Sequence, residues 1–247
     1  MADSRPVSIA APRRRGRQVL PTDQPPEGAS SPDAKPRLSF AVPVAKGKAP
    51  RHLADLDLAG RKQALKEAGL PAFRADQLSR HYFTHLTRNP ADMTDLPASQ
   101  RDALCDELLP DLLSQVRALK ADQGKTIKYL WELFDGVRVE SVLMRYKDRT
   151  TLCVSSEAGC GMACPFCATG QMGLTRNLTT AEIIGQLWWA NKAMGVTPKN
   201  ERVISNVVMM GMGEPMANFD NVVTALSIML DDHGYGLSRR RVTVSTS

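Results

Sequence analysis

The chain has 247 residues, of which 43% are hydrophobic, and it carries a formal net charge of +6. This length allows one large domain or two modest ones with a real core, and the apolar content is ordinary for a soluble globular protein. No segment approaches the roughly 20 apolar residues of a membrane-spanning helix, and the charged N-terminus lacks the hydrophobic region of a signal peptide, so we expect a cytoplasmic protein with no membrane partner.

Residues 1–50 differ from the rest of the chain in composition. They hold nine of the sixteen prolines, and nine Lys or Arg against four Asp or Glu, so they carry +5 and the remaining residues carry +1. This composition predicts a disordered, basic, proline-rich tail. Such a tail can add sequence-independent affinity for RNA or DNA, although a solvated tail without a partner explains the charge equally well.

Residues 51–115 are predicted to form a small helical domain. Gly69 with Pro71 divides the pattern into two helices. The apolar residues that recur near helical spacing are Leu65, Leu78, Tyr82, Phe83 and Leu86. Residues 116–149 are predicted to add a β-hairpin, because β-branched and aromatic residues flank Asp135-Gly136.

From residue 150 onwards, strand and helix patterns alternate. We expect strands at 150–156, 203–210 and 241–247, with helices at about 180–194 and 218–232. This is a β-α-β-α-β order, for which right-handed parallel crossovers are the rule. Such a sheet either stays open or closes into a barrel, and in both cases ligands bind at the C-terminal ends of the strands.

Three details of this region can be checked. Thr179 and Glu182 stand in capping-box register at the start of the first helix. The continuous apolar run at 203–210 predicts a strand that is buried on both faces. The second helix carries Val222, Val223, Leu226, Met229 and Leu230 at helical spacing.

Three unusual segments follow the three predicted strands. They are the cysteine segment EAGCGMACPFCATG at 157–170, the turn at 211–215 and residues 245–247. Because the carboxyl ends of parallel strands meet at one edge, these segments should converge.

The cysteine segment places Cys160, Cys164 and Cys167 within eight residues. Thiolates are soft ligands that suit zinc or iron–sulfur clusters. A 4Fe–4S cluster held by three cysteines leaves one iron free for a small molecule. Structural zinc needs a fourth ligand, for which Cys153 is available but lies in a predicted strand. A redox pair of Cys164 and Cys167 is the third possibility.

The Cys-x-x-x-Cys-x-Phe-Cys pattern after the first strand resembles the radical S-adenosylmethionine superfamily. The segments RTTLCVSSEAGC, CPFCATGQMGLTRNLTTAEIIGQ, NVVMMGMGEPMANFDNVV and LDDHGYGLSRRRVTVSTS resemble, more narrowly, the adenine C2-methyltransferases of 23S rRNA and tRNA. The resemblance runs from about residue 51 to residue 247. GLPAFRADQL and MTDLP resemble the helical accessory domain of that family, and Glu157 stands where many relatives have glutamine.

This resemblance implies a fold and a reaction. The fold would be α/β: the first half of a radical-SAM (β/α) barrel, preceded by the helical accessory domain. The enzyme would be a monomer that methylates carbon 2 of adenine in the peptidyl-transferase centre of 23S rRNA and in tRNA next to the anticodon. Its route would use a methyl-cysteine and a 5′-deoxyadenosyl radical, with a flavodoxin- or ferredoxin-type electron donor.

The resemblance also implies roles for single residues. Cys160, Cys164 and Cys167 would hold the 4Fe–4S cluster. Gly213 and Glu214 would contact the amino group of S-adenosylmethionine, and Ser245 would be another contact to this cofactor. Glu140 would accept the proton from carbon 2, and Cys153 would form a disulfide bond that resolves the covalent adduct. Considered without the family, Glu140 is an ordinary solvent-facing strand residue and Cys153 a small buried one.

The methylated cysteine of the family should lie beyond residue 247, as should the remaining barrel units. We therefore expect the first part of an enzyme, which binds a cluster but does not methylate RNA alone. Two alternatives stay open: a relative that methylates carbon 8 of adenine, and a zinc-stabilised RNA-binding protein.

Overall fold

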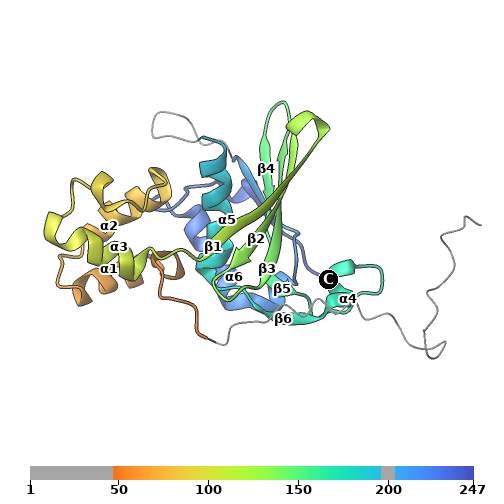
Figure 1. Ribbon diagram of the computed structural model, residues 1–247, viewed down its shortest axis with the longest axis horizontal. Coiled ribbons are helices and arrows are strands. Elements are labelled where there is room, and N and C mark those ends of the chain that lie inside the picture. The colour runs from red at the N-terminus through yellow and green to blue at the C-terminus, as the bar shows by residue number, and fades with distance from the viewer. Residues whose placement is uncertain (1–46, 196–203) are drawn as a thin grey trace, which may run out of the picture. The chain divides into compact units, whose positions relative to one another are not determined.

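The computed structural model describes residues 47–195 and 204–247 (Figure 1). The prediction of a disordered tail at 1–50 therefore falls almost wholly outside the described residues. Along the described chain, helices come first, then antiparallel strands, and then alternating strands and helices.

The region predicted to be helical contains three α-helices. They are α1 (Leu58–Glu67), α2 (Arg74–Ser79), which continues as a π-helical turn at Arg80–Thr84, and α3 (Arg101–Leu108). Gly69 follows α1 with a φ of 75°, a left-handed conformation that glycine adopts at low cost at the end of a helix. All five apolar residues named for this region are buried. The helical periodicity is confirmed for four of them, whereas Leu86 follows the last helical turn with a φ of 50°.

One mixed sheet of six strands contains both the predicted hairpin and the predicted parallel strands. Its order is β1-β2-β3-β4-β7-β8. The strands are β1 (Leu113–Ala121), β2 (Thr126–Leu133), β3 (Arg138–Arg145), β4 (Thr150–Cys153), β7 (Asn206–Met209) and β8 (Val242–Val244). The pairs β4–β7 and β7–β8 are parallel, which confirms the β-α-β-α-β order.

The hairpin around Asp135-Gly136 is confirmed as β2 and β3, but its surroundings differ from the prediction. Strand β1 pairs with β2, although the sequence predicts no strand there and the first residues of β1 fall in the range predicted to be helical. Most of β1 is exposed, so its sequence has no alternating apolar pattern that would reveal a strand. Because β3 pairs antiparallel with β4, the hairpin extends the main sheet.

Helices α5 (Thr180–Ala193) and α6 (Phe219–Leu230) connect the parallel strands and pack against each other. The capping box of Thr179 and Glu182 at the start of α5 is confirmed. Helix α5 lies on the buried face of the sheet, where the ring of Trp189 contacts the ring of Trp131 from β2 at 6.3 Å between centroids. Nearly the whole of α5 is buried.

The prediction that the strand at 203–210 is buried on both faces was wrong. In β7, Val207 and Met209 are buried while Asn206 and Val208 are only partly covered, so one face of this strand stays accessible. In α6, Val223 is exposed, because the helix is turned so that Val222, Ala225, Ile228 and Met229 face the core. A run of apolar letters cannot show which side of an element meets its neighbours.

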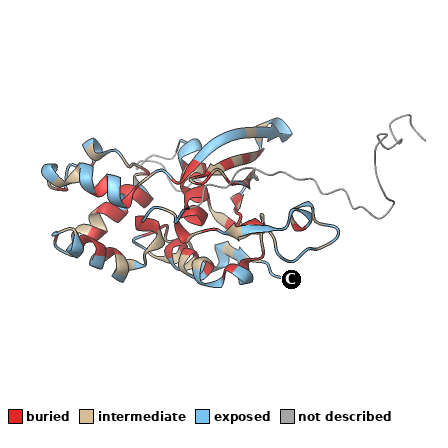
Figure 2. Cartoon of the chain, turned by 60° about the horizontal axis from the view of Figure 1, so that its bottom comes forward, coloured by how far each residue is buried: buried red, intermediate tan, exposed pale blue. Residues whose placement is uncertain are grey.

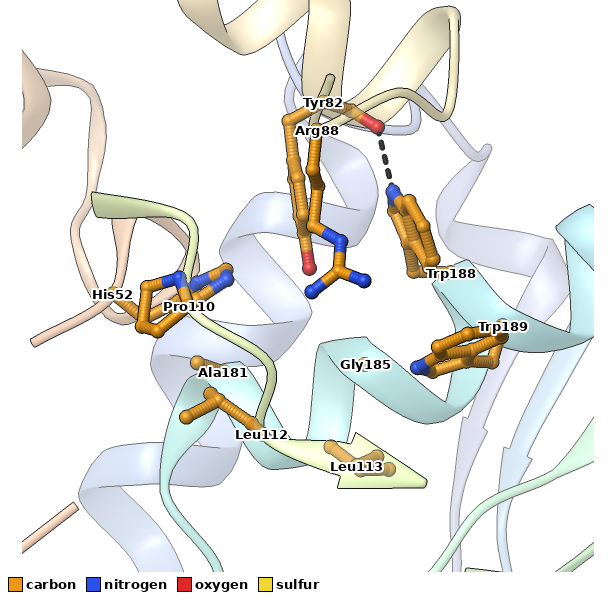
Figure 3. A pocket seen from close by; sticks show the side chains of 10 residues that line it. All are labelled: His52, Tyr82, Arg88, Pro110, Leu112, Leu113, Ala181, Gly185, Trp188 and Trp189. Atoms are coloured by element: carbon orange, nitrogen blue, oxygen red, sulfur yellow. Dashed lines mark hydrogen bonds between the residues drawn. The ribbon is translucent and has the colours of Figure 1, made fainter. Parts of the chain in front are cut away.

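The helical region meets α5 in a cluster that we call the aromatic joint: His52, Tyr82, Arg88, Trp188 and Trp189 (Figure 3). Trp188 Nε1 donates to the backbone oxygen of Tyr82 at 2.9 Å, and the two rings stack with centroids 5.6 Å apart. The guanidinium of Arg88 lies 5.1 Å from the centre of the Trp188 ring, a cation–π distance. The gap among these side chains is ≈ 10 Å³, room for about one water molecule.

A second, smaller sheet frames the cysteine segment. Strand β5 (Glu157–Gly159) pairs antiparallel with β6 (Leu174–Asn177), and the short helix α4 (Ala168–Met172) lies between them. Buried residues gather in the helices and the middle of the main sheet, whereas the segment around α4 is largely exposed (Figure 2). No helix in the described ranges has the length and hydropathy needed to cross a membrane.

Candidate functional site

A cavity of ≈ 500 Å³ lies between the main sheet and the end of the cysteine segment. Strands β2 and β3 contribute Lys128, Leu130, Arg138 and Glu140 to one side of it. Its other side is formed by Gly159, Ala168, Thr169, Met172 and Met212. A cavity of this size with a mostly apolar lining and a few charged groups is typical of a small-molecule or nucleobase site.

The register of the sheet places Glu140 and Cys153 on the same face. Val142 is paired with Cys153, and Cys153 with Val208. Paired residues point to the same face, and residues two apart along a strand do so too. Glu140, two residues from Val142, therefore shares the face of Cys153, although Cys153 does not line the cavity.

The side chain of Glu140 is 39% exposed and forms an ion pair with Lys128, Nζ to Oε1, at 2.8 Å. Its backbone oxygen accepts a hydrogen bond from the Ser155 hydroxyl at 2.6 Å. Sequence analysis missed Lys128. The hairpin register could have revealed it, because Leu130 is opposite Glu140 and Lys128 is then its diagonal neighbour.

Backbone hydrogen bonds close the cysteine segment into a compact loop. Cys160 N donates to Gly173 O at 3.0 Å, and Cys167 N donates to Cys164 O at 3.1 Å. Gly170 packs directly on the backbone of Cys164, where a Cβ would lie 2.9 Å from the Cys164 nitrogen. The three cysteines thus belong to one tightly folded segment.

The thiols of this segment are free and partly exposed. Hydrogen bonding from the Gly170 backbone N–H lowers the pKa of Cys167, which favours the thiolate form that binds metals. No three His, Cys, Asp or Glu side chains converge closely enough to hold a metal ion anywhere in the described ranges. Three thiols are the ligands that a thiophilic metal centre prefers. In this structure they lie in one loop but do not converge on a common point.

The remaining two cysteines are also free, so the disulfide implied for Cys153 is absent from the described residues. Burial raises the pKa of Cys153, and a hydrogen bond from the Met210 backbone offsets only part of this rise. Cys105 is buried near the sulfur of Met93.

The Gly213–Glu214 turn is held between β5 and the residues after β8. Glu214 N donates to Glu157 Oε2 at 2.8 Å. The Glu214 carboxylate accepts from Ser247 N at 3.1 Å and from Met216 N at 2.9 Å. Burial alone would raise the pKa of Glu214, but the hydrogen bonds from Met216, Thr246 and Ser247 lower it below its ordinary value.

These contacts confirm that the three segments after the parallel strands converge, as the sequence predicts. Ser245 itself is exposed, and within its segment it is Thr246 and Ser247 that contact Glu214. Sequence analysis noticed Glu157 without assigning it a function. Its contact with Glu214 joins residues 57 positions apart and leaves no local signal.

One buried ion-pair network connects the two sides of the cavity. From β6, Arg176 donates to both oxygens of Glu182 at 2.8 Å and to Asp135 at 2.6 Å. Burial would lower the pKa of Arg176, but these two carboxylates raise it above its ordinary value. The network joins the β2–β3 turn, the β5–β6 hairpin that carries the cysteine segment, and the start of α5.

Comparison with known proteins identifies relatives over most of the chain. No protein-family model matches it. The chain is 56% identical over 213 residues to a probable dual-specificity RNA methyltransferase RlmN from Rhodococcus erythropolis, covering 85% of this chain and 58% of that protein. A protein of the same name from Streptomyces coelicolor is 54% identical over 213 residues, with the same coverage of 85% and 58%.

A solved structure shares the fold. The crystal structure of a radical SAM methyltransferase from Sphaerobacter thermophilus matches with a TM-score of 0.74 and 41% identity, covering 80% of this chain and 57% of that one. The chain thus spans somewhat more than half the length of the relatives that it matches. Identity above 50% to these curated proteins, together with the shared fold, shows that the chain is similar, over the part of their length that it spans, to proteins named RlmN and to a radical SAM methyltransferase.

Proposed function

We propose that this protein serves the methylation of carbon 2 of adenine in 23S rRNA and tRNA. The cavity carries the proposal, because it lies between Glu140 and the end of the cysteine segment. The relatives named as dual-specificity RNA methyltransferases support it further. In this proposal residues 51–115 are an RNA-binding accessory domain, and residues 150–247 are the first half of a radical-SAM barrel.

The chemistry of the substrate favours a radical route. Carbon 2 of adenine is an electron-poor amidine carbon without a lone pair that could attack a sulfonium methyl group. The proposed ligands of a 4Fe–4S cluster are Cys160, Cys164 and Cys167, free thiols of which Cys167 has a lowered pKa. When bound, such a cluster supplies, with S-adenosylmethionine, the 5′-deoxyadenosyl radical that starts the reaction.

The residues around the cavity would bind the adenine and move its proton. The side chains of Leu130, Val137 and Met172 would offer the base an apolar surface. Glu140 would take the proton from carbon 2. The ion pair with Lys128 holds the Glu140 carboxylate beside the cavity, where a proton acceptor would have to lie.

Other residues would hold the cofactor and release the product. Glu214, with its lowered pKa, is a carboxylate suited to the ammonium group of S-adenosylmethionine. Gly213 would lie beside it, and Ser245 would contribute a hydroxyl from the neighbouring strand end. Cys153 would resolve the covalent adduct between adenine and the methylated cysteine of the family. It would do so by forming a transient disulfide. We further propose a cytoplasmic monomer that is reduced by a flavodoxin- or ferredoxin-type donor.

The test is anaerobic reconstitution of the 247-residue chain, followed by metal analysis and incubation with S-adenosylmethionine and a strong reductant. We expect a brown protein with about four irons per chain that releases 5′-deoxyadenosine. Changing Cys160, Cys164 or Cys167 to Ala should abolish both results, while Cys105→Ala should abolish neither. A colourless protein with bound zinc would instead support the zinc-stabilised RNA-binding protein.

The site of methylation is tested separately, on RNA modified by the whole enzyme. We expect mass analysis of the digested RNA to find 2-methyladenosine. Finding 8-methyladenosine in its place would assign the carbon-8 reaction.

A further inference from the structure

Glu157 is a buried carboxylate beneath the Gly213–Glu214 turn. The residue has no exposed surface. One oxygen, Oε2, accepts a hydrogen bond from Glu214 N at 2.8 Å. The other, Oε1, is buried and has no hydrogen-bond partner among the described residues. An unsatisfied buried oxygen lowers stability, so packing alone does not account for a glutamate here.

The turn lies directly on Glu157. A Cβ on Gly213 would be 2.5 Å from the Cβ of Glu157 and 2.7 Å from its nitrogen, closer than atoms can approach. Gly213 also has a φ of 100°, a conformation that favours glycine. Two further bonds join the same segments, because Ser156 N and Glu157 N donate to Met212 O at 2.9 and 3.2 Å.

Glu157 is also joined to the cysteine segment. It begins β5, which ends at Gly159, immediately before Cys160. The base of this hairpin is held by Asn218, whose Nδ2 donates to Ser156 O and to Leu178 O, both at 2.8 Å. A displacement of Glu157 would therefore change the position of the turn relative to Cys160.

We propose that Glu157 is a positioning residue that fixes the Gly213–Glu214 turn relative to the cysteine segment. The inference rests on the proposed function, in which the cysteines and the turn hold two parts of one site for S-adenosylmethionine. Two groups that bind one small molecule must keep a constant separation. The hydrogen bond from Glu214 N to Glu157, with the close contact at Gly213, supplies that constraint.

The experiment compares Glu157→Gln with Glu157→Met in the full 247-residue chain, reconstituted with iron and sulfide. Glutamine keeps an oxygen that can accept from Glu214 N, while methionine keeps a similar volume without it. We expect Glu157→Met to raise the hydrogen-exchange rate of the Glu214 amide about 10-fold, the effect of one lost hydrogen bond. The affinity of the Glu157→Met variant for S-adenosylmethionine should fall by about the same factor. Glu157→Gln should change neither the exchange rate nor this affinity more than about twofold.

Gly213→Ala provides a second variant, because it pushes the turn away while Glu157 is intact, and we expect the same losses. The proposal is overturned if Glu157→Met keeps the protection of the Glu214 amide, or loses that protection without a change in affinity. It is also overturned if Glu157→Gln behaves like Glu157→Met. If the wild-type chain holds iron but never binds S-adenosylmethionine, the proposed function fails, and the exchange rates alone decide whether Glu157 holds the turn.

Discussion

The aromatic joint and the cysteine segment show opposite ways of placing apolar side chains. In the joint, Tyr82 and Trp188 are buried and held by a stack and a hydrogen bond. In the cysteine segment, Phe166 is 88% exposed and Met162 is 47% exposed. Stability and the proposed chemistry therefore lie in separate places: a packed joint supports the scaffold, and an open loop keeps its thiols accessible.

The largest loss of stability is expected from Trp188→Ala in the joint. The change leaves a cavity and removes the stack on Tyr82 and the bond to its backbone oxygen. We expect the free energy of unfolding to fall by about 4 kcal/mol, measured by urea denaturation. A fall below about 1 kcal/mol would mean that the joint is not the main support of the helical region.

Arg176→Met tests the network that joins the β2–β3 turn, the β5–β6 hairpin and the start of α5. Asp135 and Glu182 would remain as buried carboxylates without a counter-ion. We expect a loss of about 3 kcal/mol in unfolding free energy. Arg176→Lys is the matched control, because it keeps the charge but cannot bind both oxygens of Glu182, and its loss should be smaller. Equal losses for the two variants would contradict this account.

The joint should also be sensitive to acid, through His52. Burial, with a contribution from Arg88, lowers the pKa of His52 to about 3. In the unfolded chain His52 takes up a proton below its ordinary pKa of about 6.5. In the folded chain it does so only near its lowered pKa of about 3. His52 therefore removes stability as the pH falls through this window, by about 1.4 kcal/mol per pH unit.

His52→Asn isolates this effect, because asparagine keeps an acceptor for Ala54 N but does not titrate. We expect the variant to gain about 2 kcal/mol relative to wild type between pH 7 and about pH 5. Asp55, whose pKa burial raises to about 6, acts in the opposite direction in both proteins and cancels in the difference. Parallel stability curves for the two proteins would contradict the assignment.

The smallest change is expected from Phe166→Ser in the cysteine segment. Since this ring is almost fully exposed, the free energy of unfolding should change by less than about 0.5 kcal/mol in the same urea titration. A loss above about 1 kcal/mol would show that the segment is packed in solution, and the contrast with the joint would then be lost.

The elements that could be predicted from the amino-acid sequence are those whose signals are local. Helical periodicity located α1 and α2, Asp135-Gly136 located the hairpin, and Thr179 with Glu182 located the start of α5. Each signal involves residues only a few positions apart, whose backbone preferences do not depend on the rest of the chain. The convergence of three segments also followed, because parallel strands end at one edge.

Which side chains contact one another could not be predicted from the sequence, because it depends on how the elements pack. Strand β1 is exposed and has no pattern that predicts it, and the orientation of α6 depends on its packing partners. The ion pair of Lys128 with Glu140 depends on strand register, and the bond from Glu214 to Glu157 spans 57 residues. Such contacts are properties of the packed chain, because distant residues acquire neighbours only when burial of the core fixes the strands and helices against one another.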